Sequence, residues 1–301
     1  MANFYGSYIG FGSGAAAPAT FYGTGSNYGY MLGSAPGPYT DHIQRFSFTS
    51  ASDSEDVANL SVASGFCGGC SSTTHAFVCG GTRGDVIDKH EFATTNNSTD
   101  VGNMSGSRTD PCCTSSTTHG FAAGGYPNTN VIDTFAFASI ANASDHGDLD
   151  RSVNGSNPMF SETHGYASGG QATTQRDEYA FASNTRASDH GDQSSSRSYG
   201  NGATSGTHGF TVGGGETNTL DKVSYVSGGL AADHGDLESG GNGAVAVSQT
   251  DYGYRGAGSA DQTMIQKWPW ASDAGAADTG ANMLEINSIH QSYGYAACCQ
   301  Y

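Results

Sequence analysis

The most constraining feature of this 301-residue sequence is an internal repeat with a period of about 44 residues. The clearest copies of its anchor read HGFAAGG, HGYASGG and HGFTVGG. Seven anchors, spaced 47, 44, 45, 44, 44 and 41 residues apart, begin at Tyr28, His75, His119, His164, His208, Tyr252 and Tyr293. A period of this length is typical of solenoids, propellers and repeat arrays, because one unit cannot bury its faces alone.

Two further elements recur in each of the first six units. About ten residues after the anchor comes a segment with aromatic residues at alternate positions, such as Phe135 and Phe137, which is typical of a strand with one packed face. A third element begins with an aspartate and often reads Asp-His-Gly-Asp. The leading aspartates, separated by 44, 45, 44, 44 and 45 residues, are Asp56, Asp100, Asp145, Asp189, Asp233 and Asp278.

A unit of this length with several short strands and no helical periodicity predicts a four-stranded blade, and hence an all-β propeller. The sequence predicts a single domain over 1–301, with an N-terminal closure segment (1–27), six repeats (28–292) and a partial seventh repeat (293–301). We expect seven blades, the last completed by the N-terminus. Six blades with a decorated closure is the alternative.

Composition excludes several classes of function. Eleven Lys and Arg stand against 28 Asp and Glu, which gives a formal charge of −17. We expect neither nucleic-acid binding nor insertion into a membrane, because phosphates would be repelled and no long apolar run exists. The N-terminus lacks the pattern of a secretory signal, so synthesis in the cytoplasm without a signal peptide is expected.

The anchor histidines raise the question of a metal site. They recur once per blade, at His75, His119, His164 and His208, and so would be spread around a ring rather than converge. A repeated packing role, with the ring nitrogen bonded to a neighbouring blade, is the favoured interpretation over metal binding. No metal or cofactor is predicted.

The repeated aspartates have a similar pair of interpretations. Acidic clusters can bind calcium. However, Asp before Gly suits a tight turn, in which the carboxylate caps backbone N–H groups and Gly takes a positive φ. The second acid of the motif is Asn at Asn59 and Asn103 and is absent at Ala281, which favours a structural turn.

The seven cysteines are the least symmetric feature of the sequence. Cys67 and Cys70 precede one anchor, and Cys112 and Cys113 precede the next. If the first strands of adjacent blades lie side by side, these four thiols could form disulfides between blades or a four-thiolate metal site, although their spacing is not that of a standard zinc site. Cys298 and Cys299 occupy the Gly-Gly position of the last unit and could pin the C-terminus by a disulfide.

The anchor ending in Gly-Gly, followed by a strand with spaced aromatics, resembles the kelch repeat of β-propellers. Kelch blades usually carry Tyr and Trp after the double Gly, whereas tryptophan occurs here only at Trp268 and Trp270. The combined pattern, from Thr-His-Gly-Phe to Asp-x-Gly-Asp-Leu, looks closer to kelch-like repeat proteins of marine tailed bacteriophages. The resemblance covers roughly residues 28 to 301. It implies a virion component, such as a fibre, decoration or host-contact protein.

Three functions follow as hypotheses. The first is a non-enzymatic structural or interaction protein of a virus particle, which associates with itself or with other virion proteins and is finally located on the particle. An assembly contact is expected from the aromatic N-terminal residues Phe4, Tyr5, Tyr8 and Phe11. The alternative is a carbohydrate-binding propeller for host surface glycans. An enzyme is not expected, because every candidate acid or histidine is explained as well by the repeat.

Overall fold

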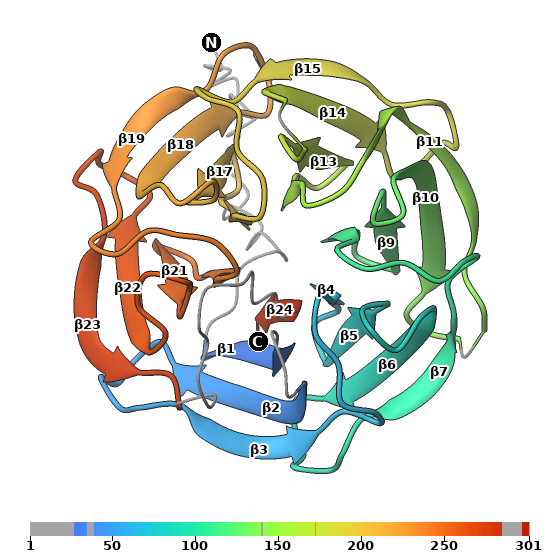
Figure 1. The fold of residues 1–301 in the computed structure, drawn as a ribbon, viewed down its shortest axis with the longest axis horizontal. Helices are drawn as coiled ribbons and strands as arrows, with labels where there is room; N and C mark the ends of the chain where they lie inside the picture. The colour runs from blue at the N-terminus through green and yellow to red at the C-terminus, as the bar shows by residue number, and fades with distance from the viewer. Residues whose placement is uncertain (1–26, 35–38, 140, 172, 285–296, 301) are drawn as a thin grey trace, which may run out of the picture.

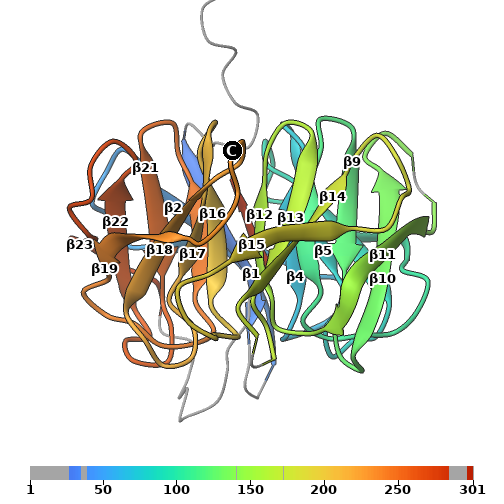
Figure 2. The ribbon, with the colours of Figure 1, turned by 90° about the horizontal axis from the view of Figure 1, so that it is seen from above.

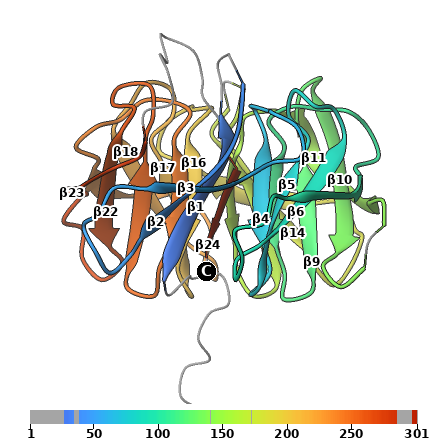
Figure 3. The same ribbon diagram turned by 90° about the horizontal axis from the view of Figure 1, so that it is seen from below.

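The computed structural model describes residues 27–34, 39–139, 141–171, 173–284 and 297–300. These residues form 24 strands and no helix, and the strands pair into six antiparallel sheets of four. The sheets stand as blades around a central axis (Figure 1), and side views show a short cylinder (Figures 2 and 3). The predicted all-β propeller of four-stranded blades is confirmed.

The strands follow one plan in every blade, from the innermost to the outermost. Blade one has β24 (Ala297–Gln300), β1 (Tyr28–Ser34), β2 (Thr40–Ser47) and β3 (Glu55–Asn59). Blade two has β4 (Gly68–Ser71), β5 (His75–Cys79), β6 (Val86–Glu91) and β7 (Thr99–Asn103). Blade three has β8 (Cys112–Ser115), β9 (His119–Ala123), β10 (Thr129–Ala136) and β11 (Ser144–Val153). Blade four has β12 (Asn157–Phe160), β13 (His164–Ser168), β14 (Gln175–Ala180) and β15 (Ser188–Asp192). Blade five has β16 (Asn201–Thr204), β17 (His208–Val212), β18 (Thr219–Ser224) and β19 (Ala232–Asp236). Blade six has β20 (Val245–Ser248), β21 (Tyr252–Gly256), β22 (Met264–Pro269) and β23 (Ala277–Asn282).

The ring has six blades, so the expected seventh blade is wrong and the six-blade alternative holds. Strand β24 supplies the innermost strand of blade one and pairs with β1, with Tyr30 opposite Cys299 and Met31 opposite Cys298. The segment after Tyr293 therefore leads into a first strand, although its sequence resembles a second strand. Residues 1–26, which contain the expected closure segment, lie outside the described residues.

Close pairs of aromatic rings, three stacked and three tilted, join every blade to the next. The ring on the second strand of one blade faces the second ring of the aromatic pair on the following blade, at centroid distances of 4.6 to 4.9 Å. The six pairs are Tyr30–Phe92, Phe77–Phe137, Phe121–Phe181, Tyr166–Tyr225, Phe210–Trp270 and Tyr254–Phe48. Each pair contributes about 0.5–1.5 kcal/mol beyond the burial of its area, so the belt of six stabilises the closed ring.

The double glycine of the anchor ends the second strand with two left-handed residues. Gly124 and Gly125 have φ of 62° and 118°, a region in which residues with a side chain are strained. A Cβ on Gly124 would also lie 2.6 Å from the carbonyl oxygen of Val153. Glycine is therefore needed here both for its conformation and for the close approach of the next loop.

None of the residues that the structure describes forms a helix long and apolar enough to cross a bilayer.

Candidate functional site

The anchor histidines are bonded within their own turns. In each of the four copies the imidazole Nδ1 lies 2.8 Å from the hydroxyl of the preceding threonine: Thr74, Thr118, Thr163 and Thr207. The backbone N–H of each histidine donates to a serine hydroxyl three residues earlier. The expected bond from the ring nitrogen to a neighbouring blade is thus wrong. The local Ser-x-Thr-His sequence satisfies Nδ1 instead, and the four rings stay at separate blades.

The repeated aspartates lie at a bulge in the outermost strand. In five copies the carboxylate accepts the backbone N–H of the residue two positions later, at 2.7 to 3.0 Å: Gly102, Gly147, Gly191, Gly235 and Gly280. All five glycines have positive φ. In the sixth copy the carboxylate of Asp56 lies 2.5 Å from His42 Nδ1. Five of the six carboxylates therefore hold local backbone geometry.

The histidine of the Asp-His-Gly motif makes contacts between blades. His146, His190 and His234 each lie against the ring that the second strand contributes to an aromatic pair, at 4.8 to 4.9 Å between centroids. Each Nε2 donates to a carbonyl oxygen of the next blade, at 2.9 to 3.3 Å. These rings tie one blade to the next, which is the role expected of the anchor histidines.

A second belt around the ring consists of buried carboxylates and arginines, which sequence reasoning missed. The third strands of blades two to five each carry a buried aspartate with an arginine partner: Arg83–Asp88, Arg108–Asp133, Arg151–Asp177 and Arg197–Asp221. In blades six and one the same position is Gln266 or Gln44, which is neutral. The sequence signal for the belt is the Asp at the same position of the third strand in blades two to five, since one arginine comes from a strand and the other three from different loops.

The backbone explains why this position is always a hydrogen-bond acceptor. Asp133 accepts the N–H of Ser105 at 3.0 Å, and Gln266 accepts that of Glu238 at 2.8 Å, in each case from the chain that leaves the preceding blade. A carboxylate that does this in the interior needs a cation beside it, whereas an amide does not. Burial raises the pKa of Asp177, and the nearby Arg151 opposes that shift.

The five described cysteines are thiols, so the expected disulfides among Cys67, Cys70, Cys112 and Cys113 are wrong for this structure. Cys67 donates to Ser64 Oγ at 3.2 Å, and Cys112 donates to the carbonyl oxygen of Tyr166 at 3.6 Å, so these two point to separate neighbours. The side chains of Cys298 and Cys299 lie outside the described part of the chain. Their place in β24 shows that they do not occupy a Gly-Gly position.

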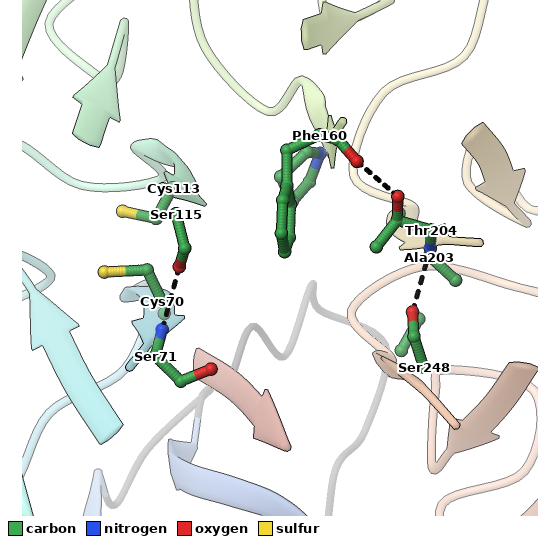
Figure 4. Close-up of a pocket in the computed structure, with 12 residues that line it drawn as sticks. Cys70, Ser71, Cys113, Ser115, Phe160, Ala203, Thr204 and Ser248 are labelled. Atoms are coloured by element: carbon green, nitrogen blue, oxygen red, sulfur yellow. Dashed lines mark hydrogen bonds between the residues drawn. The ribbon is translucent and has the colours of Figure 1, made fainter. Parts of the chain in front are cut away.

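A cluster of three cysteines joins blades two and three. Cys70 and Cys113 come from adjacent first strands with their sulfurs on the same side (Figure 4), and Cys79 packs with them from β5. Hydrogen bonds from Cys113 and Cys70 lower the pKa of Cys79, while the bond to Cys79 raises the pKa of Cys113. Among the described residues, no group of three or more His, Cys, Asp or Glu side chains is placed to hold a metal ion.

The innermost strands β4, β8, β12, β16 and β20 end in uncharged side chains, four of them small. The last residues of β4, β8, β12, β16 and β20 are Ser71, Ser115, Phe160, Thr204 and Ser248. Ser71 N donates to Ser115 Oγ at 3.0 Å and Thr204 N to Ser248 Oγ at 2.8 Å, which joins strands of neighbouring blades (Figure 4). Two cavities of about 30 and 40 Å³ lie among these strands, room for a few water molecules each.

Asp110 lines the second of these cavities, two residues before β8 begins. It adopts a φ of 54°, and its Oδ1 is buried without a hydrogen-bond partner, while Thr109 donates to Oδ2 at 3.0 Å. Burial raises the pKa of Asp110 to about 6. A single carboxyl of this kind is poised to change its charge in mildly acidic solution.

The residues expected to make an assembly contact, Phe4, Tyr5, Tyr8 and Phe11, lie outside the described residues.

In the part of the chain that the structure describes, the repeated histidines and aspartates and the arginines of the buried belt form contacts within the framework of the ring. No protein-family model matches the sequence, and no curated protein is significantly similar to it.

Proposed function

We propose that this protein is a non-enzymatic structural or interaction protein, a rigid ring that presents loops from its two faces. The observation that carries the proposal is that the repeated histidines and aspartates form contacts within the framework of the ring. The imidazoles of His146, His190 and His234 are bonded across blade interfaces, and four buried aspartates are paired with arginines. Groups held in this way stabilise the ring, which favours a structural role over a catalytic one.

The finer proposal is a component of a virion, such as a fibre, decoration or host-contact protein. It rests on the resemblance of the repeat to proteins of marine tailed phages. A closed ring whose separate sheets have only short edges suits a particle outside the cell, because long free edges invite aggregation. Its partners would be other virion proteins or further copies of the same chain.

One loop supports an interaction role directly. Between β18 and β19 the side chains of Val226 and Leu230 are 95% and 73% exposed, four residues apart. Large apolar side chains gathered on one loop favour contact with a partner surface. Val62, which is 54% exposed after β3, offers a comparable residue on a different loop.

Sedimentation velocity over a wide range of concentration tests the self-association. We expect the wild type to associate, Val226→Ser/Leu230→Ser to shift towards the monomer, and Val62→Ser to behave as the wild type. Cross-linking mass spectrometry of gradient-purified particles then tests the virion location. A monodisperse monomer that is missing from those particles would count against the proposal.

The second candidate is a carbohydrate-binding propeller. The observation in its favour is the exposure of two tyrosine rings, Tyr126 at 58% and Tyr39 at 43%, since exposed aromatic faces are common contacts for sugars. A glycan array tests it, with Tyr126→Ala and Tyr39→Ala as variants. Silence of the wild type on the array would exclude it.

A further inference from the structure

A cavity of about 250 Å³ lies between blades six and one, next to the paired rings of Tyr254 and Phe48. Phe46 and Tyr254 are buried in its wall, and the exposed Thr49 and Ser50 lie on its outer side. For comparison, an apolar cavity of about 150 Å³ is enough to bind benzene. The cavity therefore has room for a ring with a substituent.

The corresponding place is filled by an imidazole at three other interfaces. His146, His190 and His234 lie there against Phe121, Tyr166 and Phe210. The imidazole N–H groups donate to carbonyl oxygens of the next blade, which belong to Ala180, Ser224 and Pro269. These three interfaces show that this place accommodates a flat five-membered ring that donates an N–H group to the next blade.

At the interface of blades six and one the histidine is replaced by Thr279. Its hydroxyl donates to the carbonyl oxygen of Ile265 on its own blade, at 2.7 Å, and so does not cover the ring of Tyr254. Ser47, the counterpart of Ala180 by strand register, lines the cavity. At the remaining two interfaces, the residue that corresponds to Thr279 is Val57 or Val101, and each valine packs into a hydrophobic cluster.

The charged residues around the cavity differ from those at the interface of blades five and six. There Asp273 lies 2.6 Å from His234 Nδ1 and 3.8 Å from the ammonium of Lys222. In blade six Lys267 replaces Lys222, and the loop of equal length places Ala51 where Asp273 would be. Within the described part of the chain, no carboxylate lies within 4.0 Å of the Lys267 ammonium, which sits 5.0 Å from the ring centre of Tyr252.

We propose that this cavity binds a small molecule in which a planar nitrogen heterocycle carries a carboxylate. The heterocycle lies at a steep angle against the ring of Tyr254 and donates its N–H to the carbonyl oxygen of Ser47, as the imidazole does at the other interfaces. The carboxylate pairs with Lys267, in the place of the missing aspartate. This site is independent of the structural role proposed above.

Calorimetric titration of the full chain with imidazole-4-acetate tests the assignment. We expect binding at one site, with imidazole alone and acetate alone binding more weakly. Lys267→Met should weaken the binding of imidazole-4-acetate about fivefold and leave that of imidazole unchanged, because a partly exposed ion pair contributes modestly. Thr279→His should abolish the binding of both, since its own ring fills the place.

Matched variants separate occupancy from damage to the fold. Thr279→Val keeps the size of the side chain and should retain binding. Thr279→His should melt at a temperature no lower than the wild type, which shows that its loss of binding is not unfolding. His234→Thr/Asp273→Ala opens the same place beside Lys222, and the stoichiometry should rise to two.

Three outcomes would overturn the assignment. The first is a wild type that does not bind imidazole-4-acetate, and the second is a Thr279→His variant that binds it as well as the wild type does. The third is glucose binding that Thr279→His abolishes, with no response to imidazole-4-acetate, which would assign the cavity to a sugar.

Discussion

The buried pair Arg108–Asp133 offers the sharpest test of how the blades are held together. Arg108 is 6% and Asp133 0% exposed, and Arg108 Nη2 lies 2.8 Å from Asp133 Oδ2. The same nitrogen donates to the carbonyl oxygen of Ala122 at 2.9 Å. Replacing either partner leaves the other charge buried and alone.

The magnitude follows from the geometry. At about 4 Å between charge centres and an effective dielectric constant of about 20, the attraction is about 4 kcal/mol. Loss of one partner of a buried pair typically costs about 3–5 kcal/mol. We therefore expect Arg108→Met and Asp133→Asn each to lower the free energy of unfolding by about 3–5 kcal/mol.

The double variant should recover most of this loss. The side-chain amide that Asp133→Asn introduces can still accept the N–H of Ser105, and no charge remains in the interior. Blade six shows that a neutral acceptor suffices, since Gln266 accepts the N–H of Glu238. We expect the double variant to lie within about 1–2 kcal/mol of the wild type.

Equilibrium unfolding in urea at neutral pH measures all four proteins. The exposed pair Arg186–Asp150, with side chains 64% and 45% exposed, supplies the control, and Arg186→Ala should cost less than about 1 kcal/mol. Single variants at the buried pair that cost as little as this control would refute the expected role of the pair. Effects that simply add in the double variant would refute it as well.

Three further predictions concern other parts of the ring. The pKa of Asp110 is raised to about 6, so its protonated form stabilises the fold fully below about pH 4, and this stability is lost as the pH rises through 6. Asp110→Asn should therefore raise stability at pH 7 by about 1–2 kcal/mol, a value reduced for partial exposure, and flatten the profile between pH 4 and 7. A wild-type melting temperature that does not fall over this range would contradict it. Deletion of residues 297–301 removes β24 from blade one and should lower the melting temperature by about 10 °C or more, whereas deletion of residue 301 alone should have little effect. Iodoacetamide should label Cys79, Cys112 and Cys113 only after unfolding, because all three are buried and burial raises the pKa of Cys112. Mass spectrometry of the native protein that finds these thiols labelled, or joined as disulfides, would contradict this.

The fold could be predicted because the repeat appears directly in the spacing of single residues. Six aspartates about 44 residues apart mark the outermost strand of each blade, and the anchors mark the second strand. The number of blades was predicted wrongly at Tyr293, where a Tyr-Gly-Tyr sequence resembles an anchor but leads into the innermost strand. Composition alone does not distinguish the first strand of a blade from its second, since both are short and buried.

The ion pairs of the buried belt were harder to predict, because their arginines do not recur at the spacing of the repeat. Arg83 belongs to the same blade as Asp88, whereas Arg108 reaches Asp133 from the chain between two blades. The cavity at Thr279 can be recognised as a candidate site only by comparison with the interfaces at which His146, His190 and His234 lie against an aromatic ring. Even the anchor histidines were assigned to the wrong partner, because the hydroxyl of the preceding threonine bonds Nδ1 within the same turn.

The pairing of β24 with β1 has a consequence for the order in which the molecule can assemble. Gly29 lies opposite Gln300, so the contact that completes blade one spans almost the whole of the described chain. Blades two to six are each continuous in sequence and can form by local pairing. Blade one must wait until five others have brought its two parts together, and contacts of such long range slow folding. Until that moment β1 has an open edge, so we expect the unclosed ring to be the state most prone to exchanging strands with another copy.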